Sequence, residues 1–329
     1  MSADLRVLVA GGAGQVGREL QRLDGAAAFD AAGAPVRVAV TALGRGRLDV
    51  TDADRAAAVL AELRPEAVVN GAAWTAVDRA EAEREAAYAV NERGARVLAQ
   101  ACAAAGVPLV HLSTDYVFDG TKGDPYQTDD PAAPLGAYGA SKAAGEAAVR
   151  ASGGAHAILR TAWVLSGHSP GFVRTILRLA AERAPGGEKD GEPLRVVADQ
   201  WGHPTPAAAV AHAALQTAAR LTRGTDAERS SAQGTHHIAG EPLTTWHALA
   251  AAIVADAHGG GLAPVRVEPI PSGAYPTAAR RPARVELALG SSRRALGLPE
   301  IRWREALPAL VREALASPPR PSRRCRRRA

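Results

Sequence analysis

Tyr138 and Lys142 are four positions apart, a spacing that places both side chains on one face if the segment is helical. A tyrosine exchanges a proton with an alcohol or ketone more readily when a nearby ammonium lowers its pKa. Ser113 and Thr114 end an apolar run upstream, and a hydroxyl there can polarise a carbonyl oxygen. The pattern predicts a centre for carbonyl reduction with Tyr138, Lys142 and Thr114 as catalytic residues. A chance pair on an exposed helix is the alternative.

A glycine-rich segment, GGAGQVG, lies between the first apolar run and a helical pattern. Glycines there allow a tight turn and let the backbone approach a pyrophosphate, while the helix N-terminus offers free N–H groups. A plain turn is the alternative, and the strand–loop–helix context argues against it. We expect dinucleotide binding by the residues of this loop, namely Gly11, Gly12, Gly14, Gln15, Val16 and Gly17.

The residues after the second apolar run bear on which dinucleotide binds. An NAD site often places a carboxylate at the end of that strand, on the ribose 2′-hydroxyl. Here Arg45 and Arg47 come first, and the next carboxylate is Asp49. An arginine can pair with a 2′-phosphate. The sequence therefore favours NADPH, with NADH also accepted. The alternative is that both arginines are surface-loop residues that do not contact the cofactor.

Short apolar runs alternate with longer amphipathic segments through the first half of the chain. Strands are expected at 5–10, 36–42, 67–70, 107–112 and 156–161, and helices from residue 15 and at 52–63, 78–105 and 138–150. Apolar strands separated by helices imply an α/β fold with a doubly wound, Rossmann-type parallel sheet buried on both faces. Ligands bind beyond the carboxyl ends of such strands, where the residues described above lie.

The pattern loosens after residue 160. Proline and glycine become frequent, and helical segments are expected near 172–183, 206–223, 244–258 and 303–316. We predict a dinucleotide-binding domain over 1–165 and a smaller C-terminal substrate-binding lobe over 166–317, of which some segments return to the first domain. Residues 318–329 form an arginine-rich tail that we expect to be disordered.

Composition excludes several classes of protein. The net charge is +5, but six arginines lie in the tail, so the rest of the 329-residue chain carries about −1 and a specific nucleic-acid function is not expected. Runs of 18 apolar residues and a secretion signal are both missing from the sequence, so neither a membrane span nor export is expected. Cys102 and Cys325 make no disulfide framework. We expect a cytoplasmic protein.

Longer motifs carry a resemblance to a known family. They are Gly11–Gly17, Val69–Glu81, STDYVF at Ser113–Phe118, YGASKAAGE at Tyr138–Glu146, RTAWV at Arg160–Val164, Phe172–Ala180, DQWGHPT at Asp199–Thr205, TTWH at Thr244–His247 and YPTAARRP at Tyr275–Pro282. Together they resemble the extended short-chain dehydrogenase/reductase superfamily and, within it, the dTDP-4-dehydrorhamnose reductases. STDYVF, DQWGHPT and YPTAARRP are the most specific of these motifs.

The resemblance implies reduction of the C4 ketone of dTDP-4-dehydro-6-deoxy-L-mannose to dTDP-L-rhamnose with NADPH. Tyr138 would donate a proton to the C4 oxygen, Lys142 would hold the nicotinamide ribose, and Thr114 would bind the keto oxygen. Further residues expected around the cofactor are Arg45, Asp49, Val50, Ala72, Ala73, Asn91 and Ser113. Residues expected around the dTDP-linked sugar are Thr75, Thr114, Asp115, Trp163, Gly202, His203, Thr205 and Arg281, the last as a partner of the diphosphate.

Some positions depart from the family's usual pattern, namely Leu165, Gly171, Arg284, Val285, Leu287 and Ala288. They leave open a 4-ketoreductase for another dTDP-deoxysugar. A non-catalytic regulatory relative is disfavoured because Tyr138 and Lys142 are both present, and an epimerase or dehydratase is disfavoured by DQWGHPT. Some members of the family bind magnesium through glutamates at a dimer contact. Those residues are not identifiable here, so no metal is assigned, and a homodimer is left open.

Overall fold

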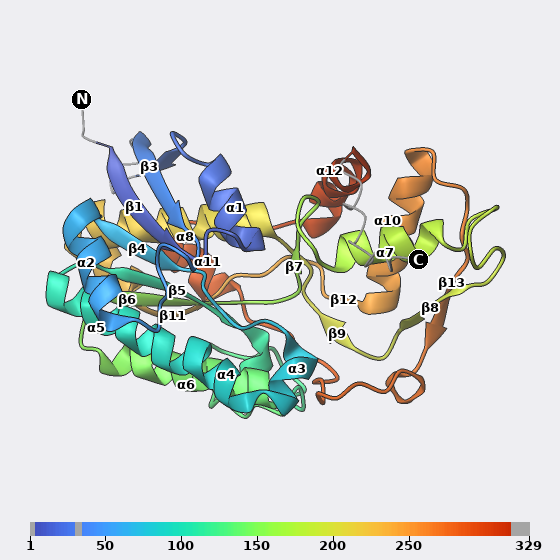
Figure 1. Ribbon diagram of the computed structural model, residues 1–329, viewed down its shortest axis with the longest axis horizontal. Coiled ribbons are helices and arrows are strands. Elements are labelled where there is room, and N and C mark those ends of the chain that lie inside the picture. Colours follow the sequence, from blue (N-terminus) through green and yellow to red (C-terminus); the bar gives the residue numbers. More distant parts are fainter. Residues whose placement is uncertain (1–3, 30–34, 317–329) are drawn as a thin grey trace, which may run out of the picture.

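A seven-stranded sheet forms the centre of the computed structural model, which describes residues 4–29 and 35–316. Its strand order is β11-β6-β5-β4-β1-β3-β2, and all neighbouring pairs are parallel except β2 with β3 (Figure 1). The strands are β1 (Leu5–Ala10), β2 (Ala27–Phe29), β3 (Pro35–Leu43), β4 (Ala67–Asn70), β5 (Leu109–Thr114), β6 (His156–Thr161) and β11 (Gly234–His237). The predicted α/β, doubly wound parallel sheet is confirmed.

Helices cover both faces of this sheet (Figure 1). Alternate residues of β1 point to opposite sides, so that Val7 and Val9 join one core and Leu8 and Ala10 another. The first core includes α1 (Gln15–Arg22) and α8 (Ala207–Arg223). The second includes α2 (Ala53–Leu63), α5 (Ala95–Ala105) and α6 (Ala137–Ala151). Burial on both sides explains why these strands are apolar throughout.

The helical stretch expected over 78–105 is interrupted. It consists of α3 (Val77–Ala82), α4 (Arg84–Tyr88), a π-helical turn η1 (Ala89–Gly94) and α5. Asn91 in this turn is buried, and its amide accepts from Trp74 N at 2.8 Å and donates to Trp74 O at 3.1 Å and Ser141 Oγ at 2.9 Å. A π-turn redirects one side chain. Here that side chain ties the loop after β4 to α6.

Several segments beyond residue 165 join the main sheet and its helical layers. Strand β11 pairs with β6, α8 packs against α1, and the short helices α9 (Asp226–Ala232) and α11 (Gly290–Leu296) pack against α8. A strand at 234–237 was not predicted from the sequence. The expected division of the chain at residue 165 stays a prediction, and the tail over 318–329 lies outside the described residues.

The remaining elements form a smaller lobe with its own apolar core. Three helices surround that core, namely α7 (Phe172–Ala181), α10 (Trp246–Gly259) and α12 (Trp303–Ala316). Short strand pairs complete the lobe or connect it to the sheet, namely β8 (Leu194–Val197) with β13 (Val267–Ile270), β9 (Trp201–Gly202) with β12 (Thr244–Thr245), and β7 (Val164–Leu165) with β10 (Thr205–Pro206). Figure 1 shows this lobe beside the sheet, on the side of the strand ends.

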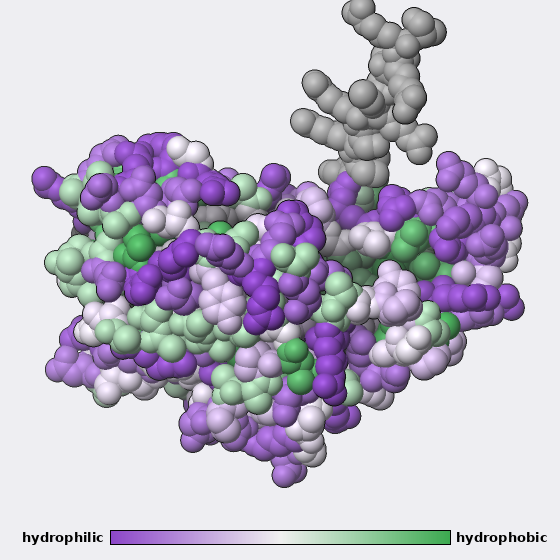
Figure 2. Space-filling model, turned by 60° about the horizontal axis from the view of Figure 1, so that its bottom comes forward, coloured by the Kyte–Doolittle hydropathy of each residue, from purple (hydrophilic) through white to green (hydrophobic). Residues whose placement is uncertain are grey.

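The outer surface is mostly hydrophilic on the face shown in Figure 2, where hydrophobic residues form small separated groups. Within the described ranges, no helix combines the length and the apolar character needed to cross a membrane. Among the residues that the structure describes, the exposed large hydrophobic side chains are Trp201, Tyr275 and Leu315.

Candidate active site

Two loops meet at the point where the strand order reverses. The chain passes from β1 to β3 on one side and then to β4 on the other, which opens a crevice beyond the carboxyl ends of β1 and β4. Gly11 has φ +84°, and a Cβ there would lie 2.5 Å from Ala72 N. A Cβ on Gly17 would lie 2.3 Å from Gly11 O. These two glycines therefore allow the loops and α1 to pack closely.

Gly14 differs from its neighbours because its open side faces a cavity. A Cβ on Gly14 would meet only Gly11 O, at 3.4 Å. As the N-cap of α1, Gly14 supplies no side-chain hydrogen bond, and the first turn of the helix holds no acidic residue. The N–H groups at this helix end are thus available for an anion.

A cavity of about 490 Å³ extends from this loop along the strand ends. Residues expected at the site from the sequence that line it are Gly14, Gln15, Val16, Gly17, Ala73, Thr75, Ser113, Thr114, Asp115, Tyr138, Lys142 and Trp163. Lining residues that the sequence analysis missed are Ala13, Gly71, Val77, Leu112, Tyr116, Thr161, Ala162, Val164, Ser169, Pro170 and Trp246. Trp246 belongs to the TTWH motif, which was the available signal for it.

Tyr138 lies in the first turn of α6, with its ring edge-on to Tyr116 at a centroid distance of 5.6 Å. Burial, and to a smaller degree the charge of Asp115, raises the pKa of Tyr138 to about 12, although a hydrogen bond with the Thr114 side chain opposes that rise. The expectation that Lys142 lowers the pKa of Tyr138 is therefore wrong for this structure. Tyr138 thus carries its proton at neutral pH, and reduction of a carbonyl requires a proton donor.

Lys142 is buried beneath the cavity. Its Nζ donates to Leu112 O at 2.7 Å and lies 3.4 Å from His111 Nε2. Burial lowers the pKa of Lys142 to about 8, while the charge of Glu146 opposes the change. The ammonium therefore predominates at neutral pH, at a position held by the backbone of β5.

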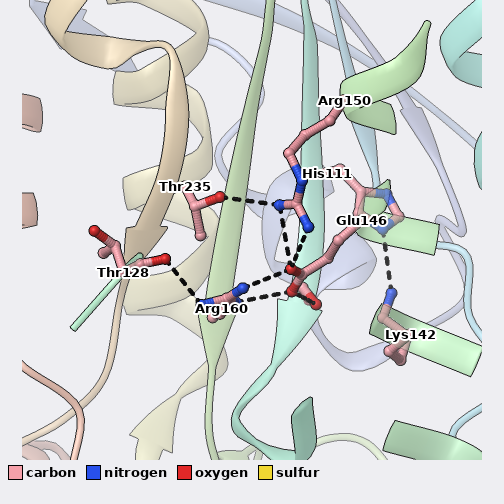
Figure 3. Close-up of polar contacts among 8 residues, drawn as sticks. His111, Thr128, Lys142, Glu146, Arg150, Arg160 and Thr235 are labelled. Atoms are coloured by element: carbon pink, nitrogen blue, oxygen red, sulfur yellow. Dashed lines mark hydrogen bonds and ion pairs between the residues drawn. The ribbon is translucent and has the colours of Figure 1, made fainter. Parts of the chain in front are cut away.

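A buried ion pair joins Glu146, one turn beyond Lys142 on α6, to Arg160 of β6 (Figure 3). Glu146 accepts from Arg160 Nε at 2.9 Å, from Arg160 Nη2 at 2.7 Å and from Ser113 Oγ at 2.6 Å. Arg150 approaches the same carboxylate at 3.4 Å. Because Ser113 Oγ is engaged with Glu146, Thr114 is the hydroxyl that lies beside Tyr138.

Asp115 is buried beside Thr114, whose Oγ1 donates to Asp115 Oδ1 at 3.0 Å. Burial raises the pKa of Asp115 to about 7. The unfolded-state pKa of an aspartate is about 3.9, so the folded-state pKa of Asp115 is the higher of the two. The contribution of this carboxyl group to stability is therefore fully present below about pH 4 and is lost as the pH rises through 7. We therefore expect Asp115→Asn to increase the free energy of unfolding more at pH 8 than at pH 5, measured by urea denaturation.

Asp119→Asn is the matched control. The Tyr126 hydroxyl and Thr121 donate to Asp119 and lower its pKa, so the stability that this carboxylate supplies is present above about pH 4. Its replacement should have the same effect at pH 5 and pH 8. An Asp115→Asn effect that is equally independent of pH would contradict the assignment of a raised pKa to Asp115.

Two residues of the DQWGHPT motif, His203 and Thr205, support the site without lining the cavity. His203 is buried, with Nδ1 2.7 Å from Gly240 O, and its Nε2 accepts from Leu287 N at 3.0 Å. Thr205 Oγ1 donates to His203 O at 3.0 Å and accepts from Gly240 N at 3.1 Å. The polar atoms of both side chains are thus hydrogen-bonded to main-chain groups. These bonds hold together loops that are distant in the sequence.

Trp163 is the aromatic wall of the cavity. It has φ +39°, an uncommon value for a residue other than glycine, and its ring stacks on Trp246 at a centroid distance of 3.5 Å. A Cβ on Gly202 would lie 2.4 Å from the Trp163 ring. Gly202 therefore acts on the site by letting this indole lie flat against β9.

Arg281 is paired with a carboxylate of the other half of the chain. Its Nη1 and Nη2 donate to Asp78 Oδ1 at 3.1 Å and Oδ2 at 2.8 Å. A second cavity, of about 520 Å³, lies beside it and is also lined by the exposed Arg280 and Tyr275. Arg281 also contacts Tyr116, which lines the first cavity, so this arginine stands between the two.

The remaining cofactor candidates lie outside the cavity lining. Arg45 Nε donates to Asp49 Oδ2 at 3.0 Å on the exposed loop after β3. Val50 is buried in the second core, and Ala72 N donates to Asn70 Oδ1 at 3.1 Å. With Gly11 and Gly12 in the loop and Asn91 in the π-turn, these residues position the backbone that faces the cavity.

One described cluster has ligand atoms close enough to hold a metal ion, although none was assigned from the sequence. Ligand atoms of Glu19, His168 and Glu313 lie within 4.8 Å of one another. Arg22 is paired with both carboxylates, and His168 Nε2 lies 2.6 Å from Glu19 Oε1. Both carboxylates of this cluster thus already have a cationic partner in the protein, and the cluster shares no residue with the cavity lining.

The fold and this arrangement of residues define a class, the Rossmann-type oxidoreductases with a tyrosine–lysine helix. The family model described as RmlD substrate binding domain matches residues 5–316. The chain belongs to this family. It is similar to dTDP-4-dehydrorhamnose reductases from Burkholderia thailandensis, at 40% identity over 95% of this chain and 100% of that one, and Streptomyces griseus, at 43% over 92% and 91%.

Solved structures agree with the sequence relatives. A dTDP-4-dehydrorhamnose reductase from Clostridium acetobutylicum aligns with a TM-score of 0.79 and 30% identity, covering 93% of this chain and 98% of that one. One from Bacillus anthracis, in complex with NADP, aligns with a TM-score of 0.79 and 30% identity, covering 94% and 100%. The similarity therefore spans both the main sheet and the smaller lobe.

Proposed function

We propose that this protein reduces the C4 ketone of dTDP-4-dehydro-6-deoxy-L-mannose with NADPH and gives dTDP-L-rhamnose. The observation that carries the proposal is a single cavity that begins at an uncapped, glycine-rich helix N-terminus and ends at Tyr138 and Thr114. A dinucleotide fits the first part and a carbonyl fits the second. The relatives that match over 95% and 92% of this chain are dTDP-4-dehydrorhamnose reductases.

The chain's own residues fit the pyrophosphate of such a cofactor. The N–H groups of α1 are free of a side-chain cap, and Gly14 leaves the space in front of them open. Gln15 Oε1 is buried without a hydrogen-bond partner among the described residues and belongs to the cavity lining. A buried polar atom without a partner costs free energy, which a bound ligand can recover.

The reaction follows from the positions of three side chains. The nicotinamide supplies the hydride when it is bound. The Thr114 hydroxyl would exchange Asp115 for the keto oxygen as its acceptor, and Tyr138, which its high pKa keeps protonated, transfers its proton to that oxygen. Lys142 offers a buried ammonium for the ribose hydroxyls. Burial of Thr114 and Lys142 and partial burial of Tyr138 limit the access of water to the carbonyl.

We place the sugar between Tyr138 and the Trp163–Trp246 stack, and the nucleotide toward the second cavity. Arg281 would have to exchange Asp78 for a phosphate, whereas the exposed Arg280 is available as it stands. The cofactor would then be bound mainly by residues 1–165, and the sugar nucleotide would also contact the lobe over 166–317. A cytoplasmic location and a homodimer stay predictions.

The positions that depart from the family's pattern do not favour another sugar. Leu165, Val285 and Leu287 are buried in apolar cores, and Arg284 pairs with Glu286 at 2.6 Å. All six departing positions lie outside both cavity linings. The alternative of a 4-ketoreductase for a different dTDP-deoxysugar therefore loses its main support.

The test is NADPH oxidation, followed by absorbance, with the L-manno ketosugar made in situ by the preceding enzymes. We expect oxidation with dTDP-L-rhamnose as product, and much slower oxidation with dTDP-4-dehydro-6-deoxy-D-glucose. Similar rates for both sugars would favour the alternative reductase. Interconversion of sugars without net loss of NADPH would identify an epimerase instead.

Cofactor choice is expected to depend on Arg45 and Arg47. A contact between an arginine and a 2′-phosphate contributes about 1.5–3 kcal/mol, so removing it should lower the ratio of kcat/KM for NADPH over NADH about 10- to 100-fold. Steady-state kinetics of Arg45→Ala and Arg47→Ala with both cofactors measure this ratio. Arg37→Ala, near the opposite end of β3, is the control and should leave it unchanged. If neither loop variant changes the ratio, these arginines do not select the cofactor.

A further inference from the structure

Thr161 carries a buried hydroxyl that nothing in the described chain satisfies. It is the last residue of β6 and is 8% exposed, yet its Oγ1 has no hydrogen-bond partner among the described residues. Few described side chains share this state, and of those only Gln15 and Thr161 line the cavity. A buried donor and acceptor without a partner destabilises the folded state, so its presence in a binding cavity points to a ligand.

The register of the sheet places this hydroxyl beside the reacting centre. Thr161 is paired with Thr114 across β5 and β6, and paired residues of neighbouring parallel strands share a face of the sheet. Leu159, two residues earlier on the same face, packs in the core that includes Leu20 of α1. Thr161 therefore lies between the helix that follows the glycine loop and the threonine that lies beside Tyr138.

A dinucleotide whose pyrophosphate binds at the N-terminus of α1 and whose nicotinamide lies near Tyr138 must place its nicotinamide close to Thr161. A hydroxyl can both donate and accept a hydrogen bond. A carboxamide offers the two matching groups, an NH2 that donates and a carbonyl oxygen that accepts. We propose that Thr161 Oγ1 hydrogen-bonds the carboxamide of the nicotinamide ring and so positions that ring for transfer. The proposal rests on the proposed function, in which the protein binds NADPH. Thr161 acts as a positioning residue.

The test is NADPH affinity without sugar, measured by fluorescence titration of Thr161→Val, Thr161→Ser and the unchanged protein. Thr161→Val keeps the shape and removes the hydroxyl, so we expect about tenfold weaker binding, as for the loss of one hydrogen bond. Thr161→Ser should bind within about threefold of the unchanged protein, since its hydroxyl remains. The fragment 2′-phospho-ADP-ribose, which lacks the nicotinamide, should bind all three equally.

A second readout excludes a merely structural role. Because Thr161 Oγ1 has no partner to lose, Thr161→Val without ligand should have a Tm equal to or above that of the unchanged protein. The matched control is Thr217→Val on α8, where a buried hydroxyl donates to Ala213 O at 2.7 Å. This control should lower the Tm and leave NADPH affinity unchanged.

Each other outcome overturns a specific statement. Unchanged NADPH affinity in Thr161→Val, with a raised KM for the sugar, would assign the hydroxyl to the sugar and overturn the carboxamide contact. Equal weakening of NADPH and of the fragment would show a structural effect and overturn it as well. An unchanged protein that binds no NADPH would overturn the proposed function itself, which separates the two failures.

Discussion

Tyr138→Phe is expected to lower kcat about 10²- to 10⁴-fold while NADPH binds with its usual affinity, because the proton donor is lost and the ring remains. The ring is held by its edge-on contact with Tyr116 at 5.6 Å, which phenylalanine can make equally well. Single-turnover rates measure the chemical step, and fluorescence titration measures NADPH affinity. A loss confined to the chemical step is the signature of a group that acts only in the transition state.

Tyr126→Phe is the control for this variant. Tyr126 is a buried tyrosine whose hydroxyl donates to Asp119 Oδ1 at 2.7 Å, away from the cavity. Its loss should reduce stability and leave kcat near the normal value. Near-normal turnover by Tyr138→Phe would show that another group donates the proton, and Asp115 would be the next candidate because its pKa is raised to about 7.

Arg160→Met is expected to lower the free energy of unfolding by about 3–5 kcal/mol, since it leaves the buried Glu146 carboxylate without its main partner. Ser113 Oγ and Arg150 remain, but Arg150 lies 3.4 Å away and is half-exposed. Urea denaturation measures the loss. The ion pair joins β6 to α6, the helix that carries Tyr138 and Lys142, so we also expect activity to fall with stability.

Two further variants identify the cause of that loss. Arg160→Met combined with Glu146→Gln should recover most of the stability, because a neutral amide can still accept from Ser113 and no unpaired carboxylate is left at residue 146. Arg178→Met breaks an exposed ion pair with Glu182 one turn along α7 and should cost at most about 0.5 kcal/mol. Equal losses from Arg160→Met and Arg178→Met would contradict a special role for the buried pair.

Most elements of the main sheet could be predicted because each strand is a local apolar run. Strand β11 could not, since Gly234–His237 contains no apolar residue and becomes a strand only by pairing with β6. The break in the helical stretch over 78–105 was missed for a similar reason. Asn91 adopts its π-turn to reach Trp74 and Ser141, and these partners are distant in sequence.

The same distinction between local and distant contacts applies to the candidate site. The relative positions of Tyr138 and Lys142 depend on spacing within one helix, and those of the glycines before α1 on spacing within one loop, so both could be read from the sequence. The position of His203 depends on backbone groups at Gly240 and Leu287, so its motif suggested a pocket residue where the structure has a support. Thr161 was missed because its distinguishing property, a hydroxyl without a partner, exists only after folding.

Transfer of deuterium from NADPH that carries deuterium at both C4 positions of the nicotinamide tests the central claim most directly. The reaction would use the L-manno ketosugar made in situ, with NMR of the isolated sugar nucleotide. We predict one deuterium at C4 of dTDP-L-rhamnose for each NADPH oxidised, since Thr114 and Tyr138 meet at a single carbonyl position in the cavity. A product without deuterium, or with deuterium at another carbon, would contradict the account.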